Sequence, residues 1–354
     1  MATPELLEGK AQTVLGIVDR SDLGITLPHE HILMDGSALY SEPSASSEKG
    51  RAFKPVDWDV LSWLRYHPFE NIDNLRLLDE AMMTREVSYF AAAGGRTIVD
   101  QGNTGLGRDP AALARIARVT GLNIIMGSGY YTVNSLKPNV LSKSVDELAD
   151  EIVRDITEGV GISRIPAGLI GEIGTSWPLH DFEKKSLLAA VKAQKATGAP
   201  INVHPGRHPQ GPMAAARILD DAGADMTRVA FSHIDGRIRT HEGRLELARL
   251  GCYLEYDLFG YEGHFPSFPG SEPIDLPNDT TRIYEIRDLM DAGYLDRVLI
   301  SHDIVCKTKL VAYGGWGYAH ILNYVVPMML KRGISQDVVD TIMIVNPARF
   351  FTFV

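Results

Sequence analysis

Short apolar runs recur along this chain, and each is followed by a longer segment with the spacing of a helix. Eight runs can be recognised, at residues 24–34, 96–102, 123–129, 167–174, 201–205, 228–234, 252–257 and 297–303. Most are continuously apolar rather than alternating, which is typical of strands buried on both faces of a parallel sheet. The pattern therefore predicts eight parallel strands.

The segments between the runs predict helices that end at glycine stop signals such as Gly121, Gly198, Gly223 and Gly251. Apolar side chains stand at helical spacing in residues 109–120, 145–158, 181–197 and 212–222. Alternation of strand and helix predicts an α/β fold, and eight units in 354 residues favour a closed (β/α)8 TIM barrel over an open sheet. We expect one domain over residues 1–354, with elaborated loops at 37–74 and 260–278.

Composition and charge narrow the functional classes. The chain carries a net charge of −10 without a run of lysine or arginine, which argues against nucleic acid or an anionic membrane as a partner. It has no apolar stretch of ~20 residues that could span a membrane, and its N-terminus does not resemble a secretory signal. Cys252 and Cys306 are too few for a disulfide framework. We therefore expect a cytoplasmic protein whose partner is a small molecule.

Imidazole and carboxylate groups stand at the carboxyl ends of several runs. Residues two apart in a strand face the same side, so His29 and His31 project together while Glu30 points away. The groups at later run ends are Glu172, His204, His233 and Asp303. Strand ends converge at one mouth of a barrel, where the active sites of this fold lie. The pattern predicts a site for borderline divalent ions such as zinc.

Each of these residues alone has an ordinary structural explanation. A single histidine near a strand end is more often a hydrogen-bonded core or turn residue, and an aspartate after a strand is commonly a helix N-cap. Placements at the same end of five strands are better explained by one shared site. A carboxylate such as Glu172 could bridge two cations, and Asp303 could both bind a metal ion and accept a proton.

The segment GITLPHEHI at residues 24–32 resembles the opening signature of the phosphotriesterase family, within the amidohydrolase superfamily. The resemblance extends to the closing segment NPAR at residues 346–349, so it covers nearly the whole chain. It implies a (β/α)8 barrel with two divalent metal ions, which we expect to be Zn²⁺. Carried over by position, one ion would be bound by His29, His31 and Asp303, and the other by His204 and His233.

The bridging position of the family falls on Glu172 in this chain. The best-known members use a carbamylated lysine there, so the chain departs from them. A glutamate resembles the phosphotriesterase-related branch, some of whose members are labelled resiniferatoxin-binding. The carboxylate still supplies two bridging oxygens, but the departure weakens any transfer of efficient phosphotriester cleavage.

Three further residues are expected to contact a substrate. Tyr130, beside Tyr131, follows the third strand, where lactone-hydrolysing relatives carry a tyrosine near the metal ions. Arg237 could pair with a substrate carboxylate or sulfonate, and Trp316 would wall the pocket. Surface packing or a loop salt bridge is the alternative explanation for each. His302, next to Asp303, is expected to be a structural hydrogen-bonding residue.

Three functional hypotheses follow. The first is a binuclear metal-dependent hydrolase that uses a bridging hydroxide to cleave an ester, lactone or amide, with phosphotriester hydrolysis secondary. The second is a metal-containing, resiniferatoxin-like binding protein without turnover, against which the complete ligand set argues. The third is a mononuclear member of the same superfamily, for example a deaminase, against which a bridging Glu172 argues. The sequence leaves the substrate, the native metal and the oligomeric state open, although relatives are commonly homodimers.

Overall fold

Eight parallel strands form a nearly closed barrel in the computed structural model, which describes residues 4–265 and 273–354. The strands follow the order β14, β11, β10, β9, β8, β7, β6, β3 around the sheet. Their bounds are Thr26–Glu30 (β3), Thr97–Asp100 (β6), Asn123–Ser128 (β7), Leu169–Gly174 (β8), Ile201–His204 (β9), Val229–Phe231 (β10), Tyr253–Tyr256 (β11) and Val298–Ile300 (β14). Each lies inside one predicted run, so the predicted TIM barrel is confirmed.

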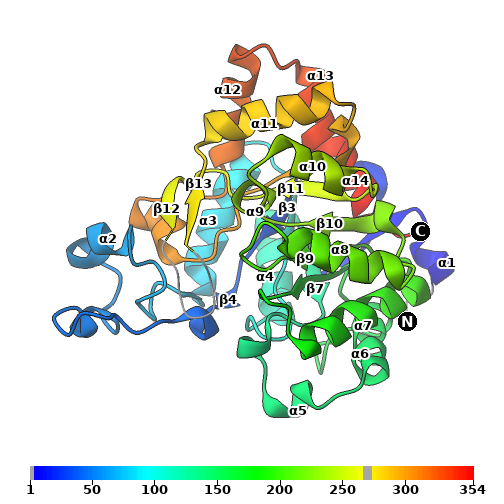
Figure 1. The fold of residues 1–354 in the computed structure, drawn as a ribbon, viewed down its shortest axis with the longest axis horizontal. Coiled ribbons are helices and arrows are strands. Elements are labelled where there is room, and N and C mark those ends of the chain that lie inside the picture. The colour runs from blue at the N-terminus through cyan, green and yellow to red at the C-terminus, as the bar shows by residue number, and fades with distance from the viewer. Residues whose placement is uncertain (1–3, 266–272) are drawn as a thin grey trace.

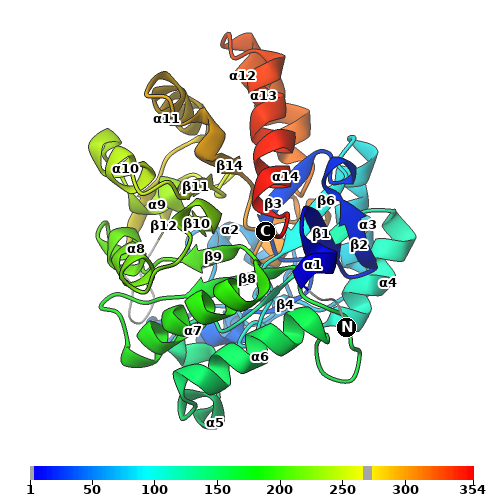
Figure 2. The same cartoon turned by 90° about the vertical axis from the view of Figure 1, so that its right-hand side faces the viewer.

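The two ends of the strand order meet, which closes the ring seen in Figure 2. The backbone N–H of Asp303, just after β14, donates to the carbonyl oxygen of His29 in β3 at 3.2 Å. The backbone N–H of His29 donates in turn to Oγ of Ser301 at 3.2 Å. The first and last strands of the barrel are therefore hydrogen-bonded where the site residues lie.

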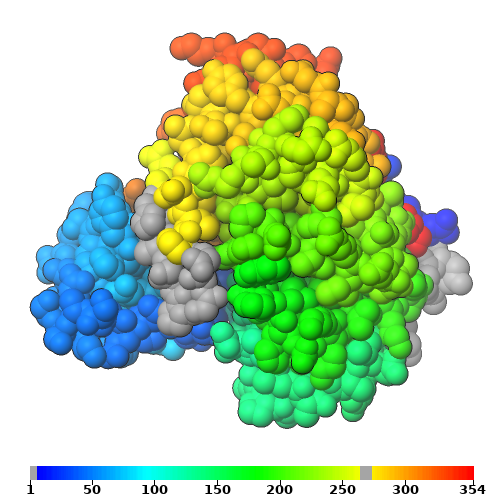
Figure 3. Space-filling model, viewed as in Figure 1, coloured from blue at the N-terminus to red at the C-terminus, as the bar shows by residue number. Residues whose placement is uncertain are grey.

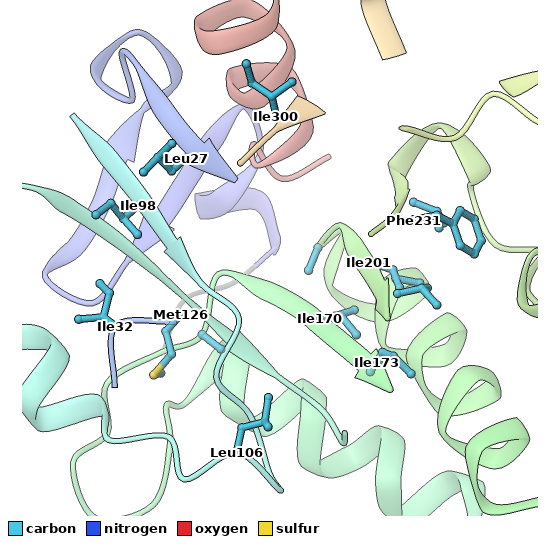
Figure 4. Close-up of a cluster of buried hydrophobic side chains, with 14 of the residues drawn as sticks. Leu27, Ile32, Ile98, Leu106, Met126, Ile170, Ile173, Ile201, Phe231 and Ile300 are labelled. Atoms are coloured by element: carbon cyan, nitrogen blue, oxygen red, sulfur yellow. The ribbon is translucent and has the colours of Figure 1, made fainter. Parts of the chain in front are cut away.

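The strands are continuously apolar because both of their faces are buried. Residues such as Ile98, Met126 and Ile170 belong to one large core, shown in part in Figure 4. Their sequence neighbours Val99 and Leu169 belong to a separate cluster, together with Phe350 and Phe351 near the C-terminus. Burial on both faces leaves polar side chains room mainly at the strand ends.

Helices surround the barrel, as Figures 1 and 2 show. Those after successive strands include α3 (Glu80–Ala92), α4 (Pro110–Thr120), α6 (Val145–Thr157), α7 (Asp181–Thr197), α8 (Gly211–Asp221), α10 (His241–Ala248) and α11 (Asp279–Asp291). The four helices predicted from the sequence are confirmed to within one residue at each end. Within the part of the chain that the structure describes, no helix has the length and apolar character needed to cross a membrane.

The two elaborated loops lie on the side of the barrel where the strands end. Residues 37–74 include α2 (Trp58–Leu64) and a small apolar cluster of their own around Val60 and Trp63. They form the blue lobe at one side of Figure 3. In the predicted loop 260–278, β12 (Gly263–Phe265) pairs with β13 (Ile274–Leu276) in antiparallel fashion, while residues 266–272 lie outside the described residues.

Candidate metal centre

The six predicted metal ligands converge at the carboxyl end of the barrel. Donor atoms lie within 4.8 Å of one another in three overlapping groups, which are His29, His31 and Glu172; Glu172, His204 and His233; and His29, His233 and Asp303. Each lies in the predicted strand or within three residues after its observed end. The geometry is therefore one connected cluster and not a set of unrelated strand-end residues.

Glu172 occupies the middle of this cluster. One carboxylate oxygen lies 3.2 Å from Nε2 of His31. The other oxygen lies 3.0 Å from Nδ1 of His204 and 3.7 Å from Nε2 of His29. A carboxylate between histidines of both predicted half-sites has the placement that a bridging ligand requires.

Position 171, just before Glu172, requires a glycine. Its φ is +139°, and a Cβ at this position would lie 2.5 Å from the carbonyl oxygen of Asn202 on the neighbouring strand. Only glycine combines this conformation with such a close approach of two backbones. The glycine thus lets β8 turn the Glu172 side chain towards the strand-end histidines.

Asp303 faces the same cluster from the end of β14. One carboxylate oxygen lies 3.3 Å from Nε2 of His31 and 3.6 Å from Nε2 of His29. Asp303 has a φ of +52° and His233 a φ of +56°, and among the described residues only one other non-glycine, Arg164, has a positive φ. Such conformations are sparsely populated and cluster at functional sites.

The residues present fit a divalent metal ion. Nε2 of His29 and one carboxylate oxygen of Asp303 are buried and have no hydrogen-bond partner in the described structure. The two atoms lie 3.6 Å apart within the cluster. Burial would lower the pKa of His29, but the carboxylates of Asp257, Glu255 and Glu172 outweigh burial and raise it to about 10. Excess negative charge around orphaned imidazole and carboxylate donors suits a cation of the zinc type.

A second layer of carboxylates, which was not predicted from the sequence, supports the histidines. Glu255 in β11 lies 3.0 Å from Nδ1 of His29, and Asp257 lies 2.9 Å from Nδ1 of His233. Asn202 and Ser232 hold Glu255 in turn, at 2.7 and 3.2 Å. Carboxylates that bond the far nitrogen of a ligand histidine fix its tautomer and orientation. The sequence does offer one indication of this layer, because Glu255 and Asp257 stand two residues apart in an otherwise apolar run.

A cavity of about 70 Å³ opens beside the cluster. His204, His233 and Asp303 line one part of it, and the arginines Arg207 and Arg237 line another. The remaining wall is Leu39, Phe69, Tyr131, Leu258, Tyr261, Ile274, Leu276 and Val305. The cavity thus combines metal-binding groups, positive charge and apolar surface, which is the composition of a small-molecule site.

Arg237 is brought to this cavity, as the sequence predicts. Its Nε donates to the carbonyl oxygen of Pro205 at 3.1 Å, and no carboxylate of the described residues forms a salt bridge with it. Burial lowers its pKa. Arg207, which was not among the predicted residues, lines the same cavity. Burial and the positive charge of Arg237 lower the pKa of Arg207 to about 9.

The other two predicted substrate residues do not line this cavity. Tyr130 is turned towards α6, where its hydroxyl donates to Glu151 at 2.5 Å. Its neighbour Tyr131 faces the site instead, with its hydroxyl 3.3 Å from Nε2 of His204. Trp316 packs against the outer side of Tyr261, with ring centroids 5.2 Å apart, and lines a separate surface cleft.

An eight-stranded α/β barrel with histidines and carboxylates gathered at its strand ends defines the class of metal-dependent barrel hydrolases. The comparisons with known proteins agree with this class. The model of the phosphotriesterase family matches residues 9–351, and the chain belongs to that family. The protein is therefore a hydrolase of the phosphotriesterase family.

Two sequence relatives and one solved structure are similar over nearly their full lengths. An N-acetyltaurine hydrolase of Mus musculus is 43% identical over 98% of this chain and 99% of its own. A phosphotriesterase-related protein of Nematostella vectensis is 42% identical over 98% and 100%. The crystal structure of a resiniferatoxin-binding protein from Rhodobacter sphaeroides superposes with a TM-score of 0.93 at 35% identity, covering 99% of this chain and 98% of that one.

Proposed function

We propose that this protein is a binuclear metal-dependent hydrolase that cleaves the amide bond of a small N-acyl compound carrying an anionic group. The observation that carries the proposal is the position of the six-residue cluster beside a cavity with two arginines on its wall. An amide is favoured over an ester or lactone because several similar relatives are named N-acetyltaurine hydrolase. Taurine compounds carry a sulfonate, which is the kind of group a guanidinium binds.

The chain's own residues divide into two proposed half-sites. His29, His31 and Asp303 would hold one zinc ion, His204 and His233 the other, and Glu172 would contact both. When bound, the two ions would polarise the amide carbonyl and lower the pKa of the attacking water. As metal ligands the histidines would be neutral, so they would complete the ligand set without adding negative charge.

Asp303 is the proposed acid and base. Hydrolysis breaks the bond between the carbonyl carbon and the nitrogen, so the attacking water loses a proton and the leaving amine gains one. An Asp303 oxygen lacks a hydrogen-bond partner in the described structure and faces the cluster, so it can carry that proton. Arg237, at the cavity wall, would hold the anionic end of the substrate and aim its amide at the cluster.

A matched substrate panel tests this proposal. Zinc-loaded protein would be assayed with N-acetyltaurine, with N-acetyl-β-alanine, with uncharged N-propylacetamide, and with a lactone and a phosphotriester. We expect the two anionic amides to have the highest kcat/KM. Faster turnover of the lactone or the phosphotriester would contradict the amide assignment. Tight binding of an anionic amide without turnover would instead favour a binding protein.

Metal analysis tests the binuclear part separately. Dialysed protein titrated with zinc should bind two ions per chain, and Glu172→Ala should fail to hold both tightly because the shared carboxylate is gone. One ion per chain at saturation would contradict the proposal and favour a mononuclear enzyme.

A further inference from the structure

Glu30 stands between two predicted ligands of β3 but faces away from the metal cluster. Its side chain is fully buried. One carboxylate oxygen accepts hydrogen bonds from Oγ of Ser301 at 2.8 Å, from the backbone N–H of His302 at 3.0 Å and from Nδ1 of His302 at 2.7 Å. The other accepts from the backbone N–H of Ile304 at 3.2 Å. All four donors belong to the residues that flank Asp303.

Asp303 needs such support because its backbone is unusual. With a φ of +52° it adopts a left-handed conformation that non-glycine residues hold only when their surroundings impose it. Its N–H donates to the carbonyl oxygen of His29, and its carbonyl oxygen accepts from the hydroxyl of Tyr261 at 2.8 Å. Glu30 contacts the segment on both sides of Asp303, through Ser301 and His302 before it and Ile304 after it.

We propose that Glu30 is the positioning residue for Asp303, acting as a clasp that fixes the turn after β14 so that the Asp303 carboxylate faces His29 and His31. A fully buried carboxylate is costly unless hydrogen bonds compensate it. Here both oxygens bond to one short segment across the closure of the barrel. The inference rests on the metal centre of the proposed function, since it assigns Glu30 a role through one of its ligands.

The chemistry of the clasp requires a carboxylate. Both oxygens of Glu30 accept from N–H groups, so an amide in its place would turn one NH2 group towards a donor. Glutamine at this position keeps the size of the side chain while spoiling one of the two contacts. Glu30→Gln is therefore the informative variant.

Glu86→Gln provides a matched control. Glu86 is also buried, and its two oxygens accept from the backbone N–H groups of Val311 and Ala312, both at 2.9 Å, in the same loop after β14. The two variants make the same chemical change in carboxylates that hold the same loop. They differ in whether the residues held flank Asp303.

Cobalt-substituted protein reports the ligand geometry without depending on a substrate. We expect Glu30→Gln to alter the visible absorption bands of bound cobalt and to weaken metal binding roughly 10- to 100-fold, the range typical of residues that orient metal ligands. Glu86→Gln should leave the spectrum and the affinity unchanged. If Glu30→Gln folds poorly, Ser301→Ala should give a smaller shift in the same direction. It removes one of the four donors to Glu30 and also the acceptor of the His29 N–H.

A double-mutant cycle decides whether the effect passes through Asp303. If it does, Glu30→Gln should change metal affinity little in protein that already carries Asp303→Asn. Additive losses, or wild-type spectra and affinities for Glu30→Gln and Ser301→Ala, would overturn the clasp. If wild-type protein itself binds no cobalt, it is the proposed metal centre that fails, which distinguishes the two outcomes.

Discussion

The two halves of the predicted metal centre differ in what surrounds them. The half at β3 and β14 is sealed, because the side chain of His29 is fully buried and its ring contacts Glu255. The half at β9 is more open, because the side chain of His204 is 17% exposed and lies beside Tyr131 and the cavity with the two arginines. Acidic groups support both halves, with Glu255 at His29 and Asp257 at His233, but basic and aromatic groups border the second half as well. The comparison suggests a division of labour, in which the sealed half holds metal and the open half meets the substrate.

The largest expected effect comes from Asp303, which belongs to the sealed half yet also lines the cavity. Asp303→Asn keeps the shape of the side chain but removes its ability to accept a proton. We expect kcat for the anionic amide to fall roughly 10²- to 10⁴-fold, as is typical for loss of a general acid–base. The assay is run at saturating zinc, with metal content measured in parallel. Retention of most of the activity would mean that another group carries the proton.

A change confined to the sealed half should affect metal binding before it affects substrate. Glu255→Gln removes the charge from the carboxylate that contacts His29. We expect zinc affinity to fall roughly 10- to 100-fold, with KM almost unchanged once zinc is saturating. Competition with a chromogenic chelator measures the affinity. If KM rose while zinc affinity stayed constant, the proposed division of labour would be wrong.

A change confined to the open half should do the reverse. Arg237→Met removes a guanidinium, so kcat/KM for the anionic amide should fall roughly 10- to 100-fold, since hydrogen bonds to charged groups contribute about 1.5–3 kcal/mol. Turnover of the uncharged amide and zinc affinity should stay near those of the wild type. Arg237→Lys, which keeps the charge but not the fork of donors, should lie between. Equal losses on both amides would argue against an anion contact.

The smallest expected effect on activity is that of Tyr131→Phe, which we compare with the same change at its neighbour Tyr130. Tyr131→Phe should lower kcat/KM by roughly 2- to 10-fold, because the hydroxyl lost near His204 is a single neutral hydrogen-bonding group. Tyr130→Phe, its matched control, loses only the bond to Glu151 and should change stability without changing kinetics. Steady-state kinetics and thermal melting measure the two effects. A larger kinetic loss for Tyr130→Phe would reverse the assignment.

The sequence predicted the barrel and the convergence of the six donors for a simple physical reason. Strands buried on both faces leave few polar positions, so polar residues at their carboxyl ends stand out. The supporting pair Glu255 and Asp257 stood out in the same way, but no rule of spacing says that a carboxylate will contact a histidine instead of a metal ion. That distinction depends on side-chain directions across three strands.

Tyr130 and Trp316, two aromatic residues predicted to contact a substrate, do not line the cavity. Ser128 and Tyr130, two residues apart, both bond to carboxylates of α6 outside the barrel, so they share one face. Simple alternation then places Tyr131 on the opposite face, towards the cluster. Trp316 occupies space that a side chain at position 260 would fill, since a Cβ on Gly260 would lie 2.4 Å from its ring. The position of Trp316 depends on loop backbone conformation, which the pattern of apolar and polar residues does not encode.

The bond between Ser301 and Glu30 joins residues 271 positions apart in the chain. During synthesis, the first two histidines therefore leave the ribosome long before their aspartate partner exists. A nascent chain can assemble seven strands and still lack the segment that completes one half of the centre. High-affinity capture of metal at that half is thus expected to be a late event in biogenesis, coupled to closure of the ring by its last strand.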